Sequence, residues 1–296
     1  MKKPGRLITA MVTPFNVEGE VDYEQAKRLA LALLDSGSEG VVVVGTTGES
    51  PTLMREEELC LFTEVKSAVG ERGVVIAGTG SNSTAEAMKT TKEAERIGVD
   101  ACLLVVPYYN KPTQEGLYQH FKTIAESTSL PCILYNVPSR TVANLSADTV
   151  IRLSYIDNII GVKEASGNFG QISQIISNTR DDFLVWSGND GDTLPILVLG
   201  GYGIISVASH LVGNQIKEMI DSFVSGKIGE AARMHHYLLP LIDALFIVGN
   251  PMPVKYALNY IGFNVGKPRL PLTEPDEKTA AFIRDTLKDY RIDLPV

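Results

Sequence analysis

Short apolar segments rich in β-branched residues alternate with longer amphipathic segments from the start of the chain to about residue 209. The apolar segments have the length and the flanking turn residues of strands, and the segments between them have the period of helices. Regular alternation of this kind predicts a parallel sheet, because parallel neighbours need a crossover connection. The predicted strands are 7–14, 40–45, 74–78, 101–107, 132–136, 159–164, 183–187 and 203–207. The predicted helices between them are 23–36, 55–69, 84–97, 114–127, 146–153, 171–180 and 193–199.

Eight strand–helix units favour an α/β fold of the closed (β/α)8, or TIM, barrel type, with a doubly wound open sheet as the alternative. A nucleotide-binding open sheet carries Gly-x-Gly-x-x-Gly after its first strand, whereas residues 13–16 read Thr-Pro-Phe-Asn. We therefore expect a barrel catalytic domain over 1–209 and a helical C-terminal extension packed on it over 210–296. The helices predicted in that extension are 215–226, 228–247, 253–261 and 277–289.

Composition narrows the choice of partners. The chain of 296 residues has a net charge of −8 and no cluster of Lys and Arg, which argues against a nucleic acid or an anionic membrane as partner. The apolar segment 7–12 is too short for a signal peptide, and no apolar run approaches the ~20 residues of a membrane-spanning helix. We expect a cytoplasmic protein.

The three cysteines are odd in number and widely spaced, at Cys60, Cys102 and Cys132. Buried free thiols are expected rather than disulfides or a zinc site. No histidine has a metal-like spacing to Cys, Asp or Glu, so no metal is assigned. The histidines are His120, His210, His235 and His236.

Lys163 lies at the end of a predicted strand whose other residues are mostly apolar and β-branched. Burial at such a position removes hydration and lowers the pKa of the amine, and a neutral amine can attack a ketone to form a Schiff base. The alternatives are a lysine that extends to the surface or one that pairs with a carboxylate. Glu164 is no obvious partner, because adjacent strand residues point to opposite faces.

The loop 45–50, Gly-Thr-Thr-Gly-Glu-Ser, follows the second predicted strand. Its hydroxyls and backbone N–H groups suit a small anion such as a carboxylate. The alternative is a glycine-rich turn whose threonines cap local backbone. The loop lacks the Gly-Lys ending of a phosphate-binding loop.

Other strand ends carry further candidates. Tyr135 could shuttle protons near an amine, or be a core aromatic residue with its hydroxyl bonded to backbone. Arg140, in the loop after the fifth strand, could hold a substrate carboxylate, or be an ordinary surface arginine. Tyr108 and Tyr109 could meet a partner subunit, or lie in the core. In a barrel all these strand ends meet at one mouth.

Together the motifs resemble the dihydrodipicolinate synthase family, one of the pyruvate-dependent Schiff-base lyases and aldolases that include N-acetylneuraminate lyase. The resemblance extends to Asn250-Pro-Met-Pro-Val-Lys255 and Arg269-Leu-Pro-Leu272, nearly the whole chain. Arg140 favours the synthases, because sialic acid lyases lack an arginine there. The matching motifs are Gly45-Thr-Thr-Gly-Glu-Ser50, Pro107-Tyr-Tyr-Asn110, Tyr135-Asn-Val-Pro-Ser-Arg140 and Gly161-Val-Lys-Glu-Ala-Ser166.

The resemblance implies a class I lyase that condenses pyruvate with L-aspartate 4-semialdehyde in diaminopimelate and lysine biosynthesis. Lys163 forms the imine, so neither a metal nor an organic cofactor is implied. Arg140 holds the second substrate's carboxylate, and the implied assembly is a homotetramer, a dimer of dimers. The proton relay is Tyr135, Thr46 and Tyr109, the last from a neighbouring subunit. Pyruvate contacts are implied for Thr47, Ile205 and Gly188.

A lysine-effector site of the family corresponds to Ser50, Arg55, Glu58, Asn82, Glu86 and Tyr108. Inhibited members carry histidine or another aromatic residue at the place of Glu58, and often histidine at the place of Arg55. The charged pair in this chain predicts weak or absent inhibition by lysine. Val248-Gly249 is a second departure, at a place where many relatives have glutamate, and has no functional account.

Three other functions compete with this one. One is another pyruvate aldolase, which would act on sialic acid or 2-keto-3-deoxy sugar acids. Arg140 and the Tyr108–Tyr109 pair argue against this function. A barrel that binds a 2-oxo acid without turnover is disfavoured by Lys163 and its relay residues. A phosphate-binding aldolase is disfavoured because 188–191 and 206–209 lack a phosphate loop.

Overall fold

The eight predicted strands are present in the computed structural model, which describes residues 4–296, and they form a closed barrel in sequence order. The pairing is parallel wherever its register is defined, as in Tyr135 opposite Lys163. The barrel prediction is confirmed. The basic start of the chain, with Lys2 and Lys3, lies outside the described residues. The strands are β1 Leu7–Ala10, β2 Gly40–Val43, β3 Val74–Gly78, β4 Ala101–Val105, β5 Cys132–Asn136, β6 Ile159–Glu164, β7 Leu184–Ser187 and β8 Gly203–Ser206.

Strands β1, β2, β4 and β8 end earlier than predicted, and for β1 and β2 the reasons lie at their carboxyl ends. Backbone pairing from β1 continues only to Met11, whose N–H donates to the Val42 carbonyl. Beyond it, the Thr13 hydroxyl donates to the Gly48 carbonyl at 2.6 Å, which ties two loops together. Val44 has a φ of 60° and takes the chain out of β2. Hydrophobicity continues past the end of each ladder, so the apolar pattern overestimates strand length.

Several of the helices between the strands begin at side-chain caps. Asp22, Ser83, Thr113 and Ser146 each accept the backbone N–H three residues on, which satisfies a donor that has no partner inside the helix. The sequence did not predict the four-residue α5. These helices are α1 Tyr23–Asp35, α2 Arg55–Val69, α3 Thr84–Ile97, α4 Gln114–Ala125, α5 Pro138–Thr141, α6 Ala147–Leu153, α7 Phe169–Asn178 and α8 Thr193–Val198, with short 3-10 turns at Ser50–Thr52 and Asp190–Asp192.

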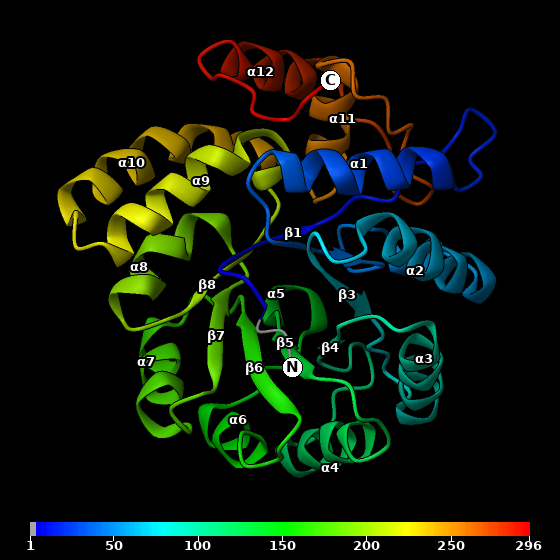
Figure 1. The fold of residues 1–296 in the computed structure, drawn as a ribbon, viewed down its shortest axis with the longest axis vertical. Coiled ribbons are helices and arrows are strands. Elements are labelled where there is room, and N and C mark those ends of the chain that lie inside the picture. The colour runs from blue at the N-terminus through cyan, green and yellow to red at the C-terminus, as the bar shows by residue number, and fades with distance from the viewer. Residues whose placement is uncertain (1–3) are drawn as a thin grey trace. The chain divides into compact units, whose positions relative to one another are not determined.

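Further helices follow β8, as the pattern predicts. The first begins earlier than expected, at Ser209, and is kinked at Val212, whose φ and ψ are −129° and 40°. Helices α9 and α10 lie side by side, and α12 contacts α10 and α11 (Figure 1). They are α9 Ser209–Val224, α10 Ile228–Leu245, α11 Met252–Tyr260 and α12 Glu277–Leu287.

Internal contacts divide the described chain into two compact units, residues 4–75 with 206–296 and residues 76–205. In the second unit, Leu104, Leu134 and Val162 from successive strands are fully buried. They belong to one apolar cluster with Phe121 of α4 and Ile172 of α7. This cluster supports β4 to β7 from the helix side, and most of the candidate catalytic and substrate-binding residues lie on or just after these strands.

The cysteines are free thiols, as predicted. Cys102 and Cys132 are buried opposite each other on β4 and β5, with their sulfur atoms 3.4 Å apart. The prediction of a buried thiol was wrong for Cys60, which is only half-buried on α2. The thiol lies beside Tyr23 of α1 and keeps some contact with solvent, which the apolar pattern does not reveal.

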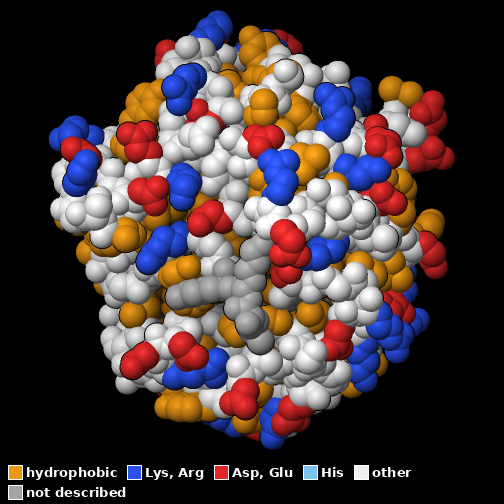
Figure 2. All heavy atoms as spheres, viewed as in Figure 1, with side chains coloured by type: hydrophobic (Ala, Val, Ile, Leu, Met, Phe, Trp, Pro, Cys, Tyr) orange, Lys and Arg blue, Asp and Glu red, His pale blue; other side chains and the backbone are white. Residues whose placement is uncertain are grey.

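The described surface mixes charges of both signs, and Lys and Arg side chains are interspersed with Asp and Glu over the face drawn in Figure 2. Across residues 4–296, no helix combines the length and apolar character that crossing a membrane requires. The same part of the chain contains no group of three or more His, Cys, Asp and Glu side chains that could hold a metal ion.

Candidate active site

Lys163 lies near the carboxyl end of β6, between Tyr135 of β5 and Trp186 of β7. Its side chain is buried, with only 5% of the residue exposed. Gly161, two residues earlier, permits this close packing of strands. A Cβ at Gly161 would lie 2.2 Å from the Leu184 carbonyl oxygen, so any larger residue would push β7 away.

The amine of Lys163 is desolvated and has no bond to the residues described in its own unit. Its Nζ lies 4.4 Å from the centroid of the Tyr135 ring. Within residues 76–205 it has no hydrogen bond or ion pair. Burial lowers the pKa of Lys163 to about 8; the carboxylate of Asp190 raises it and the guanidinium of Arg140 lowers it further. About a tenth of the amine is then neutral at pH 7, far more than for an exposed lysine.

Glu164 is bonded elsewhere, as strand alternation predicts. Its carboxylate accepts from the Asn136 amide at 3.1 and 3.2 Å, the Gln171 amide at 3.2 Å and the Ser166 N–H at 2.9 Å. Burial raises the pKa of Glu164, and these hydrogen bonds oppose that rise. A carboxylate so engaged is not available to pair with Lys163.

Arg140 follows β5 on α5, not in a loop as the sequence suggested. Pro138 starts this short helix, because a proline at the first helical position lacks only an N–H that would have no partner. Val142 ends it with a φ of 59°. Arg140 is exposed, and its charge reaches Lys163, whose pKa it lowers.

The turn after β7 leaves room for the lysine side chain. A Cβ at Gly188 would lie 2.7 Å from the Ala165 Cβ and 3.2 Å from the Lys163 Cε. Asp190, in the same turn, is 3% exposed and opposes the lowering of the pKa of Lys163. Asp190 was not predicted from the sequence, although an aspartate in the turn after a predicted barrel strand is an available signal. Ile205 is fully buried on β8 of the same unit.

The loop 45–50 belongs to the first unit. Thr47 is buried, and its hydroxyl accepts from the Asn250 amide at 2.9 Å. This contact joins residues 203 positions apart, so Thr47 does not simply cap local backbone. Thr46 is half-buried, and Glu49 has a left-handed φ of 58°.

Tyr109 is the most exposed of the candidates, at 90%, and has a φ of 74°. The turn around it is nonetheless tied down. Asn82 donates to the Tyr108 carbonyl at 3.1 Å, and Asn110 donates to the Asn82 carbonyl at 2.9 Å. A rigid turn therefore presents an exposed aromatic ring.

The candidate effector residues divide between the two units. In the second, Asn82 contacts Tyr108, and Glu86 accepts from Ser81 at 3.2 Å. The others lie on the first unit: Ser50 begins a 3-10 turn, and Arg55 and Glu58 lie in the first turn of α2.

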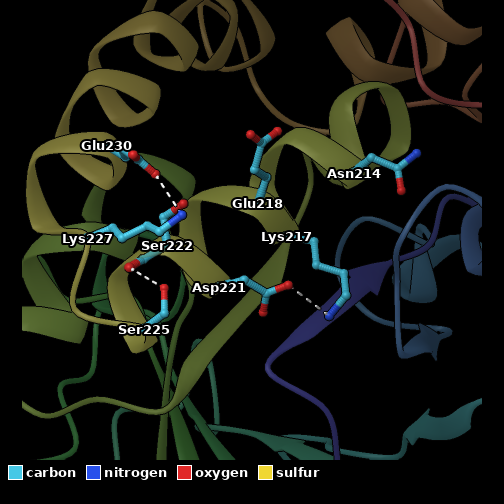
Figure 3. Close-up of a pocket in the computed structure, with 8 residues that line it drawn as sticks. All are labelled: Asn214, Lys217, Glu218, Asp221, Ser222, Ser225, Lys227 and Glu230. Atoms are coloured by element: carbon cyan, nitrogen blue, oxygen red, sulfur yellow. Dashed lines mark hydrogen bonds and ion pairs between the residues drawn. The ribbon is translucent and has the colours of Figure 1, made fainter.

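A surface pocket of about 480 Å³ between α9 and α10 is a poor second candidate (Figure 3). Its lysines face neighbouring carboxylates, Lys217 with Asp221 at 3.6 Å and Lys227 with Glu230 at 3.5 Å. Local pairing of both cations leaves this pocket without an unbalanced positive charge for an anion.

A (β/α)8 barrel with a desolvated lysine near the end of its sixth strand, unbonded within its own described unit, has the arrangement of a Schiff-base lyase. The dihydrodipicolinate synthetase family model matches residues 3–290. The 4-hydroxy-tetrahydrodipicolinate synthase of Dehalococcoides mccartyi is 71% identical over 296 residues, all of both chains. The chain belongs to the dihydrodipicolinate synthetase family.

Solved structures agree with this assignment. A dihydrodipicolinate synthase from Bacillus anthracis superimposes with a TM-score of 0.96 at 48% identity, covering 98% of this chain and 100% of the other. The enzyme from Cyanidioschyzon merolae, determined with lysine bound, gives a TM-score of 0.95 at 48% identity, covering 96% and 97%.

Proposed function

We propose that this protein is a class I lyase that condenses pyruvate with L-aspartate 4-semialdehyde, the 4-hydroxy-tetrahydrodipicolinate synthase reaction of diaminopimelate and lysine biosynthesis. Relatives carrying that name match it along its full length. The observation that carries the chemistry is the amine of Lys163, which is buried and has no bond within its own unit.

The reaction starts with attack of the neutral Lys163 amine on the pyruvate ketone. Loss of water from the carbinolamine gives a protonated imine, which acts as the electron sink. Removal of a proton from the methyl group then gives an enamine, whose carbon attacks the aldehyde and forms the new C–C bond. The amine of the semialdehyde displaces Lys163, which closes the ring and frees the enzyme.

Proton transfer in these steps is proposed for Tyr135, Thr46 and Tyr109. This role is best supported for Tyr135, because its ring lies against the Lys163 amine. For substrate positioning, Thr47 and the backbone near Gly188 and Ile205 bind pyruvate. Arg140 binds the carboxylate of the second substrate, a role suited to an exposed guanidinium whose charge reaches Lys163.

Tyr109 is proposed to act in the active site of a neighbouring subunit, within a homotetramer built as a dimer of dimers. A fixed turn with a 90% exposed tyrosine supports a role outside its own chain. Mixing Tyr109→Phe with Lys163→Ala tests this directly. If Tyr109 acts in trans, the mixture regains activity, because one site per hybrid dimer has both residues. Mixing without any gain in activity contradicts this arrangement.

Lysine is proposed to inhibit weakly or not at all, because Arg55 and Glu58 offer charges where inhibited relatives offer aromatic rings. An inhibition curve measured over lysine concentration tests this. Clear inhibition at submillimolar lysine contradicts it.

Reductive trapping tests the proposed chemistry. The protein is mixed with pyruvate and borohydride, and its intact mass is measured beside that of Lys163→Ala. One pyruvate per chain on the wild type and none on the variant supports the Schiff-base mechanism. Folded wild-type protein without an adduct contradicts it. Sialic acid and 2-keto-3-deoxy sugar acids serve as competing substrates, and faster turnover of either contradicts the assignment of substrate.

A further inference from the structure

A buried ion pair in the first unit joins α11 to the loop that carries Thr46 and Thr47. Lys255 Nζ lies 2.8 Å from Glu49 Oε1, and both side chains are fully buried. The same nitrogen donates to the Thr13 carbonyl at 3.0 Å and to the Lys267 carbonyl at 3.2 Å. An ammonium has three donors, and here each has an acceptor. Because every donor is engaged, the Lys255 nitrogen is not available as a second nucleophile.

The other oxygen of Glu49 joins the same loop to the segment after α11. Oε2 accepts the backbone N–H of Arg269 at 2.8 Å. The Arg269 guanidinium donates to the Gly19 and Thr52 carbonyls at 2.8 and 2.9 Å and pairs with Glu57 at 2.6 Å. One arginine thus connects the turn after β1, the end of the 45–52 segment and the first turn of α2.

These contacts hold the loop in a backbone conformation that it does not favour on its own. Glu49 has a φ of 58°, a left-handed conformation that costs roughly 1–2 kcal/mol for a residue with a Cβ. The Thr52 N–H and hydroxyl both bond the Glu49 carbonyl, at 2.9 and 3.0 Å. At the other end of the loop, Asn250 donates to the Thr47 hydroxyl. The C-terminal segment is therefore bonded to the loop at two residues, Thr47 and Glu49.

A role in stability alone explains this arrangement less well. Burying two opposite charges costs desolvation that their attraction does not always offset, so a buried pair is weak evidence for stability. What the pair does supply is direction, because a carboxylate with both oxygens engaged fixes the backbone that carries it. The backbone fixed here is that of Thr46 to Glu49.

We propose that Lys255 and Glu49 are positioning residues for pyruvate, which set the loop so that Thr46 and Thr47 meet the substrate. This proposal rests on the function proposed above, in which Thr47 and its backbone bind the pyruvate carboxylate. It gives the helical C-terminal extension a part in substrate binding. Neither residue touches the reacting atoms.

The test is Lys255→Met in the full-length protein, with steady-state kinetics for both substrates and reductive trapping of pyruvate. KM for pyruvate is expected to rise on the order of tenfold to a hundredfold, because a small misplacement of binding groups is costly. The value of kcat at saturating pyruvate and KM for the semialdehyde are expected to change much less. Glu49→Gln, which keeps an acceptor for the Arg269 N–H, is expected to raise KM for pyruvate less than Glu49→Ala does.

Lys288→Met is the matched control, because it removes an exposed lysine that pairs with Asp285 at 2.7 Å just after α12. If Lys255→Met does not fold, the double variant Glu49→Gln/Lys255→Met leaves neither charge alone and takes its place. A variant that melts earlier but keeps the wild-type KM for pyruvate overturns the proposal. Failure of the wild type to trap pyruvate is a different result, and it overturns the proposed function itself.

Discussion

Lys163 and Lys255 are both buried lysines whose pKa burial lowers to about 8, but their nitrogens have opposite surroundings. Lys255 has a carboxylate and two carbonyl oxygens as acceptors. Lys163 has the face of Tyr135 at 4.4 Å and, within its own unit, no hydrogen-bond or ion-pair partner. A lowered pKa therefore does not identify a nucleophile. The absence of acceptors around the amine does.

The difference has a physical basis in what each environment stabilises. Acceptors around Lys255 stabilise the ammonium, which cannot attack a ketone. Around Lys163 the charged form loses hydration and gains little in return, so the neutral form and the imine are relatively favoured. Burial disfavours the charge at both sites, but at Lys255 a carboxylate and two carbonyl oxygens offset part of that cost.

The largest effect is expected for Lys163→Met, which removes the nucleophile. Turnover should fall on the order of a thousandfold or more, because the covalent route is lost. Lys163→Arg should be equally inactive, although it keeps a cation in place, and this separates nucleophilicity from charge. Steady-state assays at saturating substrates measure both. Substantial activity in either variant would falsify the assignment of Lys163.

Stability should separate the two lysines in the opposite sense. Lys255→Met leaves Glu49 buried without its cation and should lower the free energy of unfolding by about 3–5 kcal/mol. Lys163→Met removes a desolvated charge and should leave that free energy unchanged or raise it. Denaturant unfolding at pH 7 at matched protein concentration measures both. A large loss of stability in Lys163→Met would contradict the view that this amine has no stabilising partner.

The pH dependence of imine formation should follow Lys163 and not Lys255. The pKa of Lys163 is lowered to about 8, so the neutral amine increases as pH rises toward that value and levels off above it. The trapping rate at subsaturating pyruvate should rise about tenfold per pH unit below the midpoint. Lys255→Met should leave the midpoint in place. A rate that is flat between pH 6 and 9 does not fit a titrating nucleophile.

The smallest expected effects are opposite shifts of that midpoint on removal of the two charges that act on the pKa of Lys163. Asp190→Asn removes an anion that raises the pKa of Lys163, so the midpoint should move to lower pH. Arg140→Ala removes a cation that lowers it, so the midpoint should move to higher pH. Arg140→Ala should also raise KM for the semialdehyde. Shifts in the same direction would show that a change in packing, not charge, dominates.

Much of the barrel could be predicted from the sequence, because each strand–helix unit has a local pattern. Lys163 and Tyr135 could be predicted for the same reason, because both lie at the ends of predicted strands. The pair Glu49 and Lys255 was not, because its members are 206 residues apart and only the closed fold brings them together. Helix α5 was missed because four residues are too few to show a period.

The thiol pair on β4 and β5 has a practical consequence. Cys102 and Cys132 are fully buried, so an alkylating reagent can reach them only when the wall between the strands and α4 opens. Cys60 is half-buried and should react without such opening, which gives an internal reference on the same chain. Timed alkylation followed by mass spectrometry then measures the rate at which the barrel opens locally beside its reactive lysine.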